Sequence, residues 1–300
     1  MPMPAIIAAT DFTPRSAHVG NRAAMIAELL RSRLILAHSV SSAPADADQA
    51  ASDTHETHLF AAEAAPGKLT RIGRSLRLLP RGLTNPEAAL RDLAHHLGPE
   101  VEIRLLRGAV DVSLSDLAEE EAALMLVLGL HRERRVLDVL RLTTMERIVL
   151  AATVPVLIAH QRPRDGYRRV LAPTDFSPAS AAALRMAARI APKASFHAIH
   201  ALQVPLGARF SPGDAATDAA LTRAEQLRTA FLAMPDLPEF AEPPEIVPGG
   251  VHEVLAFRQN ELRADLLCIG THSGRDPLQL GNYARDLMRA PPTDLLVAKP

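Results

Sequence analysis

The sequence is poor in the residues that build disulfide frameworks and aromatic stacking surfaces. Its 300 residues contain one cysteine and no tryptophan, and aromatic residues make up 3% of the chain. A single cysteine excludes an internal disulfide and is typical of a reducing compartment, so we expect a cytoplasmic protein. The scarcity of aromatic residues argues against a surface on which nucleic-acid bases stack. The core must therefore be built from small and aliphatic side chains.

Strong charge and long apolar runs are also missing. The net charge is −1, so the composition gives no basic field for a nucleic-acid partner. No apolar run approaches the roughly 20 residues that a membrane helix requires, and we expect no membrane partner. The start, Met1-Pro2-Met3-Pro4, lacks the charged region and apolar core of a secretory signal.

One short segment of the chain occurs twice in nearly the same form. Ala9-Thr10-Asp11-Phe12-Thr13-Pro14 follows a short apolar run, and so does Pro173-Thr174-Asp175-Phe176-Ser177-Pro178. An alanine-rich helical pattern follows each of them. With 300 residues, this repeat predicts two domains, 1–161 and 167–300, separated by a polar linker.

The two copies differ in length between matching strands. The spacing falls from 162 residues between His38 and His200 to 141 between Gly129 and Gly270, so the first copy has about 21 extra residues. We expect this insert around residues 41–84.

Apolar strands alternate with helical patterns in both copies, which predicts the α/β class with parallel sheets covered on both faces. In such sheets, ligands bind beyond the carboxyl ends of the strands. Asp11 and Asp175 each end a first strand, and Gly129 and Gly270 each end a fourth. A carboxylate there can accept hydrogen bonds from ribose hydroxyls or an adenine amine. Small residues before a helix let backbone N–H groups approach a phosphate.

The chain also contains the matching strand ends Leu36-Ala37-His38 and Ala198-Ile199-His200, and the segments Val154–Ile158 and Asp265–His272. Together with the two Thr-Asp-Phe segments, and in this order, they resemble the universal stress protein family in its tandem form. The resemblance implies two doubly wound domains, each with a five-stranded parallel sheet of order 3-2-1-4-5, paired through their last strands as in a homodimer. It also implies a stress-response protein that binds an adenine nucleotide (ATP, ADP or AMP) and is not an enzyme.

Nucleotide-binding members of that family carry Gly-x2-Gly-x9-Gly-Ser/Thr after the fourth strand, and both copies depart from it. In the first copy Gly129 and Thr143 fit, but Arg132 and Leu142 replace glycines. In the second, the spacer is two residues shorter. The resemblance then implies that the second copy holds the better nucleotide site, made by Asp175, Gly270, His272, Ser273, Gly274, Gly281 and Asn282, and that Asp11, Gly129 and Thr143 form a weaker set.

Other interpretations stay open. The aspartates can simply brace the strand–helix turns, and the glycines can simply serve those turns. Arg132 can pair with a phosphate or fill the space that the phosphate needs. The protein can then be an interaction module of the same fold that needs no nucleotide, or a nucleotide hydrolase or transferase.

The sequence gives little support for a catalytic site or a metal site. The chain has no Walker loop, no Gly-x-Ser-x-Gly and no Gly-x-Gly-x-x-Gly after the first strand. His55-Glu56-Thr57-His58 and His95-His96 offer imidazoles, but the pattern is not His-Glu-x-x-His. We expect no metal site.

Overall fold

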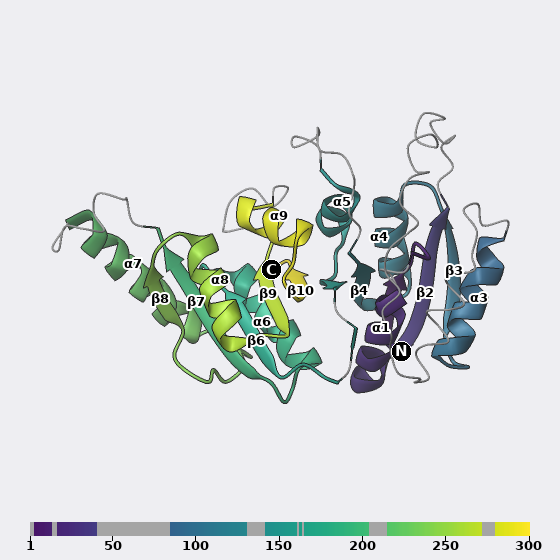
Figure 1. Cartoon of the computed structure of the whole chain (residues 1–300), viewed down its shortest axis with the longest axis horizontal. Helices are drawn as coiled ribbons and strands as arrows, with labels where there is room; N and C mark the ends of the chain where they lie inside the picture. The colour runs from purple at the N-terminus through teal and green to yellow at the C-terminus, as the bar shows by residue number, and fades with distance from the viewer. Residues whose placement is uncertain are drawn as a thin grey trace, which may run out of the picture.

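In the computed structural model, the described residues are 3–13, 17–40, 85–130, 142–160, 162–163, 165–203, 215–271 and 280–300. Within them, one sheet runs through both copies in the order β3-β2-β1-β4-β5-β10-β9-β6-β7-β8, as Figure 1 shows. The strands of the first copy are β1 (Ala5–Ala9), β2 (Arg33–Val40), β3 (Glu102–Arg107), β4 (Ala123–Gly129) and β5 (Val156–Ala159). Those of the second are β6 (Arg169–Pro173), β7 (Ser195–Leu202), β8 (Glu245–Pro248), β9 (Leu266–Gly270) and β10 (Asp294–Ala298).

Each copy confirms the predicted order 3-2-1-4-5 with parallel pairing throughout. The last strands of the two copies meet in the middle of the sheet and run antiparallel, with Leu296 opposite Leu157. This pairing leaves neither last strand as an open edge.

Helices cover both faces of the sheet, which explains why the central strands are apolar along their whole length. In the first copy the helices are α1 (Ala17–Leu30), α3 (Pro86–Leu97), α4 (Val110–Glu120) and α5 (Thr144–Ala151). In the second they are α6 (Pro178–Ile190), α7 (Ala215–Leu232), α8 (Val251–Leu262) and α9 (Asn282–Arg289).

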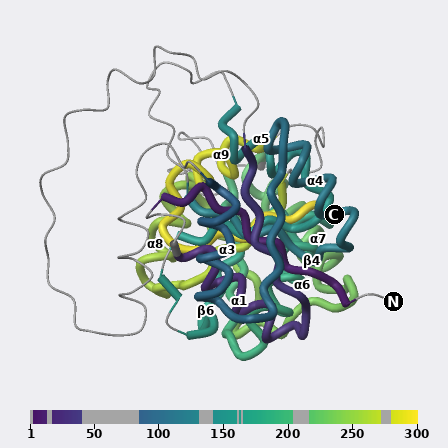
Figure 2. Tube along the Cα trace, turned by 90° about the vertical axis from the view of Figure 1, so that its right-hand side faces the viewer, coloured from purple at the N-terminus to yellow at the C-terminus, as the bar shows by residue number. Residues whose placement is uncertain are grey.

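Two apolar layers extend across both copies. One contains Leu90 of α3 and Leu184 of α6, and the other contains Ile148 of α5 and Met288 of α9. In Figure 2, accordingly, α1 and α3 lie on one side of the first copy and α4 lies on the other. Because each layer contains residues from both halves, the two copies share both layers of the core.

A buried polar network joins the copies beside the linker. Asp294 is fully buried and accepts hydrogen bonds from the Tyr167 hydroxyl (2.7 Å) and the His160 N–H (2.8 Å). Its carboxylate lies 3.0 Å from Nε of Arg22, whose guanidinium stacks 4.2 Å from the Tyr167 ring centre. Burial, and then the charge of Asp294, raise the pKa of Tyr167, so its hydroxyl remains a donor.

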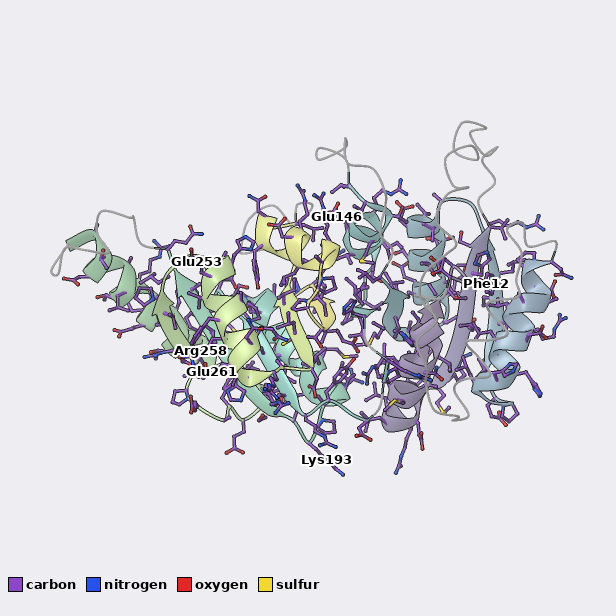
Figure 3. The ribbon with its side chains drawn as sticks, viewed as in Figure 1. Phe12, Glu146, Lys193, Glu253, Arg258 and Glu261 are labelled. Carbon is purple, nitrogen blue, oxygen red and sulfur yellow. The ribbon has the colours of Figure 1, made fainter. Side chains whose placement is uncertain are left out.

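A second buried carboxylate lies where α5 meets α9, as Figure 3 shows for Glu146. One Glu146 oxygen accepts a hydrogen bond from the Thr143 N–H at 2.7 Å. The other lies 3.1 Å from Nε of Arg289 and 3.5 Å from Nε of Arg285. The start of α5 in the first copy thus forms ion pairs with two arginines of α9 in the second copy.

The insert predicted around residues 41–84 lies outside the described residues. The boundaries 1–161 and 167–300 therefore stay predictions. In the part of the chain that the structure describes, no helix combines the length and the apolarity that crossing a membrane requires.

An ion network at the amino ends of β2 and β3 predicts a pH effect on stability. Glu121 accepts hydrogen bonds from Arg33 (2.9 Å) and Arg104 (2.7 Å), and these lower the pKa of Glu121 below its ordinary value of 4.5. A lowered folded-state pKa stabilises the protein above the unfolded pKa, and that stabilisation disappears as pH falls through the folded pKa. We expect Glu121→Gln to cost about 1 kcal/mol at pH 7.

Urea denaturation at pH 7 and near pH 3 checks this prediction. The difference between the parent protein and Glu121→Gln should shrink on acidification. A difference that stays constant with pH contradicts the prediction.

Candidate functional site

The repeated Thr-Asp-Phe segment forms the same turn in both copies. Phe12 and Phe176 have φ values of 58° and 63°, a left-handed conformation that is rare for bulky residues. The hydroxyl oxygens of Thr10 and Thr174 accept the N–H of these phenylalanines at 3.1 and 2.9 Å. The threonines therefore hold a backbone conformation that would otherwise be unfavourable.

A histidine from the neighbouring strand supports each turn. Nδ1 of His38 lies 2.8 Å from the Thr10 carbonyl oxygen, and Nδ1 of His200 lies 2.8 Å from that of Thr174. Because a carbonyl oxygen only accepts, Nδ1 must donate, and this fixes the tautomer of both rings. The sequence identified these histidines only as strand ends. Their matching positions in the two copies were the signal that could have shown their supporting role.

The two aspartates brace their turns in different ways. Oδ1 of Asp11 accepts the Thr13 N–H at 3.0 Å and the Thr13 hydroxyl at 2.7 Å, and the residue is exposed. Oδ1 of Asp175 accepts the Ser177 N–H at 3.0 Å and the Ser180 hydroxyl at 2.8 Å, and the residue is partly buried. Asp175 is thus fixed by the first turn of α6.

Asp175 also lines a pocket of about 930 Å³, the second-copy pocket. The pocket lies at the carboxyl ends of β6, β7 and β9 and at the amino ends of α8 and α9. This is the position where parallel α/β sheets bind ligands. Of the residues predicted for the second site, the structure brings together Asp175, Gly270, Gly281 and Asn282. His272, Ser273 and Gly274 lie outside the described residues.

Gly270, which lines this pocket, is required by close packing at the end of β9. A Cβ atom there would lie 2.7 Å from Cβ of Ala179, 2.8 Å from its carbonyl carbon and 2.9 Å from the Ser180 nitrogen. These atoms belong to the first turn of α6, which approaches the end of β9. The glycine therefore brings Ser180 and Asp175 towards the strand end.

The helices that follow the two fourth strands begin differently. In the first copy, the Thr143 hydroxyl accepts the Glu146 N–H at 3.2 Å, and Glu146 accepts the Thr143 N–H in return. This capping box satisfies the start of α5 from within the chain. The α9 start has Gly281 as its N-cap, and no described side chain caps it. The amino end of α9 lines the second-copy pocket.

The predicted residues of the first copy have structural partners. Gly129 ends β4 opposite Ala159 of β5. The Thr143 hydroxyl, predicted to face a phosphate, serves the α5 capping box. Asp111 in the first turn of α4 lies 3.8 Å from Arg147, and Glu146 places a second carboxylate at the start of α5. Carboxylates at helix starts make this end of the first copy less suited to a phosphate.

The second copy differs at the matching positions. His252, 141 residues after Asp111, replaces that acid at the start of α8 and lines the pocket. Its ring packs edge-on against Tyr283 with centres 5.1 Å apart, and Nε2 lies 3.5 Å from Asp286. Burial raises the pKa of Tyr283, which keeps its hydroxyl protonated. His252 and Tyr283 carry no signal in the sequence, since neither belongs to a repeated motif.

Metal ligands are not clustered in the described ranges, where no group of three or more His, Cys, Asp or Glu residues could hold an ion. His95 and His96 lie in the last turn of α3, and Nδ1 of His96 lies 2.6 Å from the Asp92 carbonyl oxygen. His55 and His58 lie outside the described residues.

Comparison with known proteins agrees with the duplicated architecture. The profile of the Universal stress protein family matches residues 3–160 and again 166–299. The chain belongs to the universal stress protein family. The two matches cover nearly the whole chain, so this is a tandem member with one family domain in each copy.

Solved structures show the same fold at low sequence identity. A universal stress protein from Archaeoglobus fulgidus DSM 4304 is 17% identical, with a TM-score of 0.61 over 98% of both chains. A functionally unknown protein from Pseudomonas aeruginosa PAO1 is also 17% identical, with a TM-score of 0.61 over 99% of this chain and 93% of that one. A search of curated proteins finds no match. At 17% identity, the similarity of this tandem universal stress protein to the two structures shows a shared fold.

Proposed function

We propose that this tandem universal stress protein binds an adenine nucleotide in the second-copy pocket and acts in a cytoplasmic stress response without turning over a substrate. The observation that carries the proposal is the meeting, in one pocket, of Asp175 and the start of α9, which has no side-chain cap among the described residues. A fixed carboxylate suits ribose hydroxyls or the adenine amine, and a helix start suits a phosphate. The proposal is confined to the second copy.

The apolar lining of the pocket is further evidence for a nucleoside as the ligand. Ile199, Leu202, Val251 and Leu255 line the side formed by β7 and α8. Apolar walls with a few placed polar groups are typical of small-molecule sites. The volume of about 930 Å³ falls within the range of such sites.

A second candidate is a module that needs no nucleotide. The observation in its favour is that Oδ1 of Asp175 already accepts two hydrogen bonds from its own turn. In that case the repeated aspartate has only a structural role in both copies, and the function lies in interactions with other proteins.

A nucleotide-binding measurement distinguishes the nucleotide-binding proposal from the interaction module. We expect ATP, ADP or AMP to stabilise the full chain against thermal unfolding, by about 2.7 kcal/mol at a ligand concentration of 100 times Kd. Asp175→Ala should weaken binding by tenfold or more, because it removes the carboxylate that faces the nucleoside.

Asp11→Ala is the matched control, since it removes the same residue from the same turn outside the second-copy pocket. We expect it to leave the affinity unchanged. If none of the three nucleotides shifts the unfolding temperature at millimolar concentration, the nucleotide proposal fails and the interaction module is favoured.

A further inference from the structure

We infer that the first copy positions the ligand site of the second. The buried Glu146 of the first copy holds α9, and with it the part of the second-copy pocket that α9 forms, in the geometry that binds the nucleotide. Glu146 is a positioning residue in this scheme and touches no ligand itself. The inference rests on the proposed function, since it assumes that the pocket binds an adenine nucleotide.

One helix carries both a part of the pocket lining and the contact with the first copy. Gly281, Asn282 and Tyr283, at the start of α9, line the second-copy pocket. Arg285 and Arg289 follow on the same helix and reach Glu146. In Figure 1, α9 accordingly lies between α8, whose start also lines the pocket, and α5 of the first copy. A change in the position of α9 therefore changes the pocket.

The contact of α9 with the first copy is a buried ion pair. The Glu146 side chain is fully buried, and its Oε1 accepts a hydrogen bond from Nε of Arg289 at 3.1 Å. Nε of Arg285 lies 3.5 Å from the same oxygen. Separating a buried carboxylate from its cations is costly, because its charge is then uncompensated. The ion pair therefore opposes any movement of α9 away from α5.

Apolar packing gives α9 only a small anchor. The helix has eight residues, and its buried residues are Ala284 and Met288. Helices this short are marginal in water, and tertiary contacts supply most of their stability. An alanine and a methionine bury little apolar area between them. The contacts of the two arginines with Glu146 therefore contribute substantially to the position of α9.

The two ends of this contact occupy matching positions of the two copies. Leu296 faces Leu157 where the last strands pair, and the same spacing of 139 residues relates Arg285 to Glu146. An acid of the first copy thus meets a base of the second. Two identical copies would place like charges at this point, and like charges repel each other. The first copy, whose own predicted site residues have structural partners, supplies the carboxylate that the second copy needs here.

The test is calorimetric titration of the full chain with AMP, ADP and ATP, in the parent protein and in Glu146→Gln. The substitution removes the charge but keeps an oxygen that can accept the Thr143 N–H at the start of α5. For the nucleotide that binds the parent most tightly, we expect the affinity to fall by about threefold or more. An unchanged or increased affinity overturns the inference and leaves the proposed function intact. If no nucleotide binds the parent protein, the proposed function fails and the inference fails with it.

A double-mutant cycle separates positioning from a general loss of stability. Arg289→Gln breaks the same contact from a side chain that is 33% exposed, so it serves as the test if Glu146→Gln does not fold. It should weaken nucleotide binding in the parent protein but have little further effect in Glu146→Gln, because both substitutions act through one contact. An unchanged affinity in Arg289→Gln, or additive effects in the double variant, overturns the inference.

Asp294→Asn is the matched control at the same junction. Asp294 is also a buried carboxylate that pairs with an arginine of the other copy, but it belongs to β10 and not to α9. We expect this substitution to destabilise the protein and to leave the nucleotide affinity at its parent value. An equal loss of affinity in Asp294→Asn and Glu146→Gln would show that the general stability of the junction sets the affinity, which overturns the inference.

Discussion

Asp294→Ala is expected to lower the free energy of unfolding by about 3–5 kcal/mol, because it removes one partner from a buried ion pair. Asp294 is fully buried, and the Arg22 that it faces is 6% exposed. Without the carboxylate, a guanidinium remains in the core with its charge uncompensated. The Tyr167 hydroxyl and the His160 N–H lose their acceptor as well. Urea denaturation followed by circular dichroism measures the change.

An exposed ion pair provides the control for Asp294→Ala. Glu87 and Arg91 of α3 lie 2.6 Å apart, with side chains 54% and 65% exposed. Glu87→Ala should cost less than about 1 kcal/mol. The double variant Arg22→Met with Asp294→Leu should be more stable than Asp294→Ala, since it leaves no buried charge. Equal costs for Asp294→Ala and Glu87→Ala would show that the buried network does not stabilise the junction of the copies.

Gly270→Ala is expected to cost about 1–3 kcal/mol and to abolish binding in the second-copy pocket. The new Cβ would lie within 2.9 Å of backbone atoms of Ala179 and Ser180, which cannot rotate away as a side-chain tip can. The first turn of α6 must therefore shift, and forced repacking of this kind has a cost of that size. The shift also moves Ser180 and Asp175, two groups that line the pocket. Thermal unfolding with and without AMP measures both effects.

Gly166→Ala in the linker is the control for that substitution. No described atom lies within 4 Å of a Cβ placed there. We expect its stability to stay within about 0.5 kcal/mol of the parent protein and its ligand response to be unchanged. If Gly270→Ala behaves like Gly166→Ala, the close packing of α6 on β9 is not what shapes the pocket.

Part of the candidate site was predictable because it belongs to a local motif. Thr174, Asp175 and Phe176 are adjacent in sequence, and their turn forms through hydrogen bonds between residues no more than five apart. Comparison with Thr10, Asp11 and Phe12 made the pattern visible. Ser177 could be placed as the α6 cap for the same reason.

The other residues of the candidate site come from segments that are distant in sequence. His252 and Tyr283 meet because α8 and α9 lie on the same face of the sheet, and neither residue carries a motif. Thr143 looked like a phosphate ligand in sequence. Its hydroxyl caps α5, because Glu146 stands three residues later and completes a capping box.

The sequence by itself determined the alternation of strands and helices, the two-copy organisation and the position of the aspartate turns, since these depend on apolar periodicity and on local hydrogen bonds. The strand order was an expectation from the resemblance to the family. Only the tertiary structure decided how the copies differ. Antiparallel pairing of β5 with β10 places Glu146 against Arg285 and Arg289. The same contact pairs two arginines of the second copy with a carboxylate of the first. Which charged side chains meet in space is set by packing between segments far apart in the chain, and neither segment shows it alone.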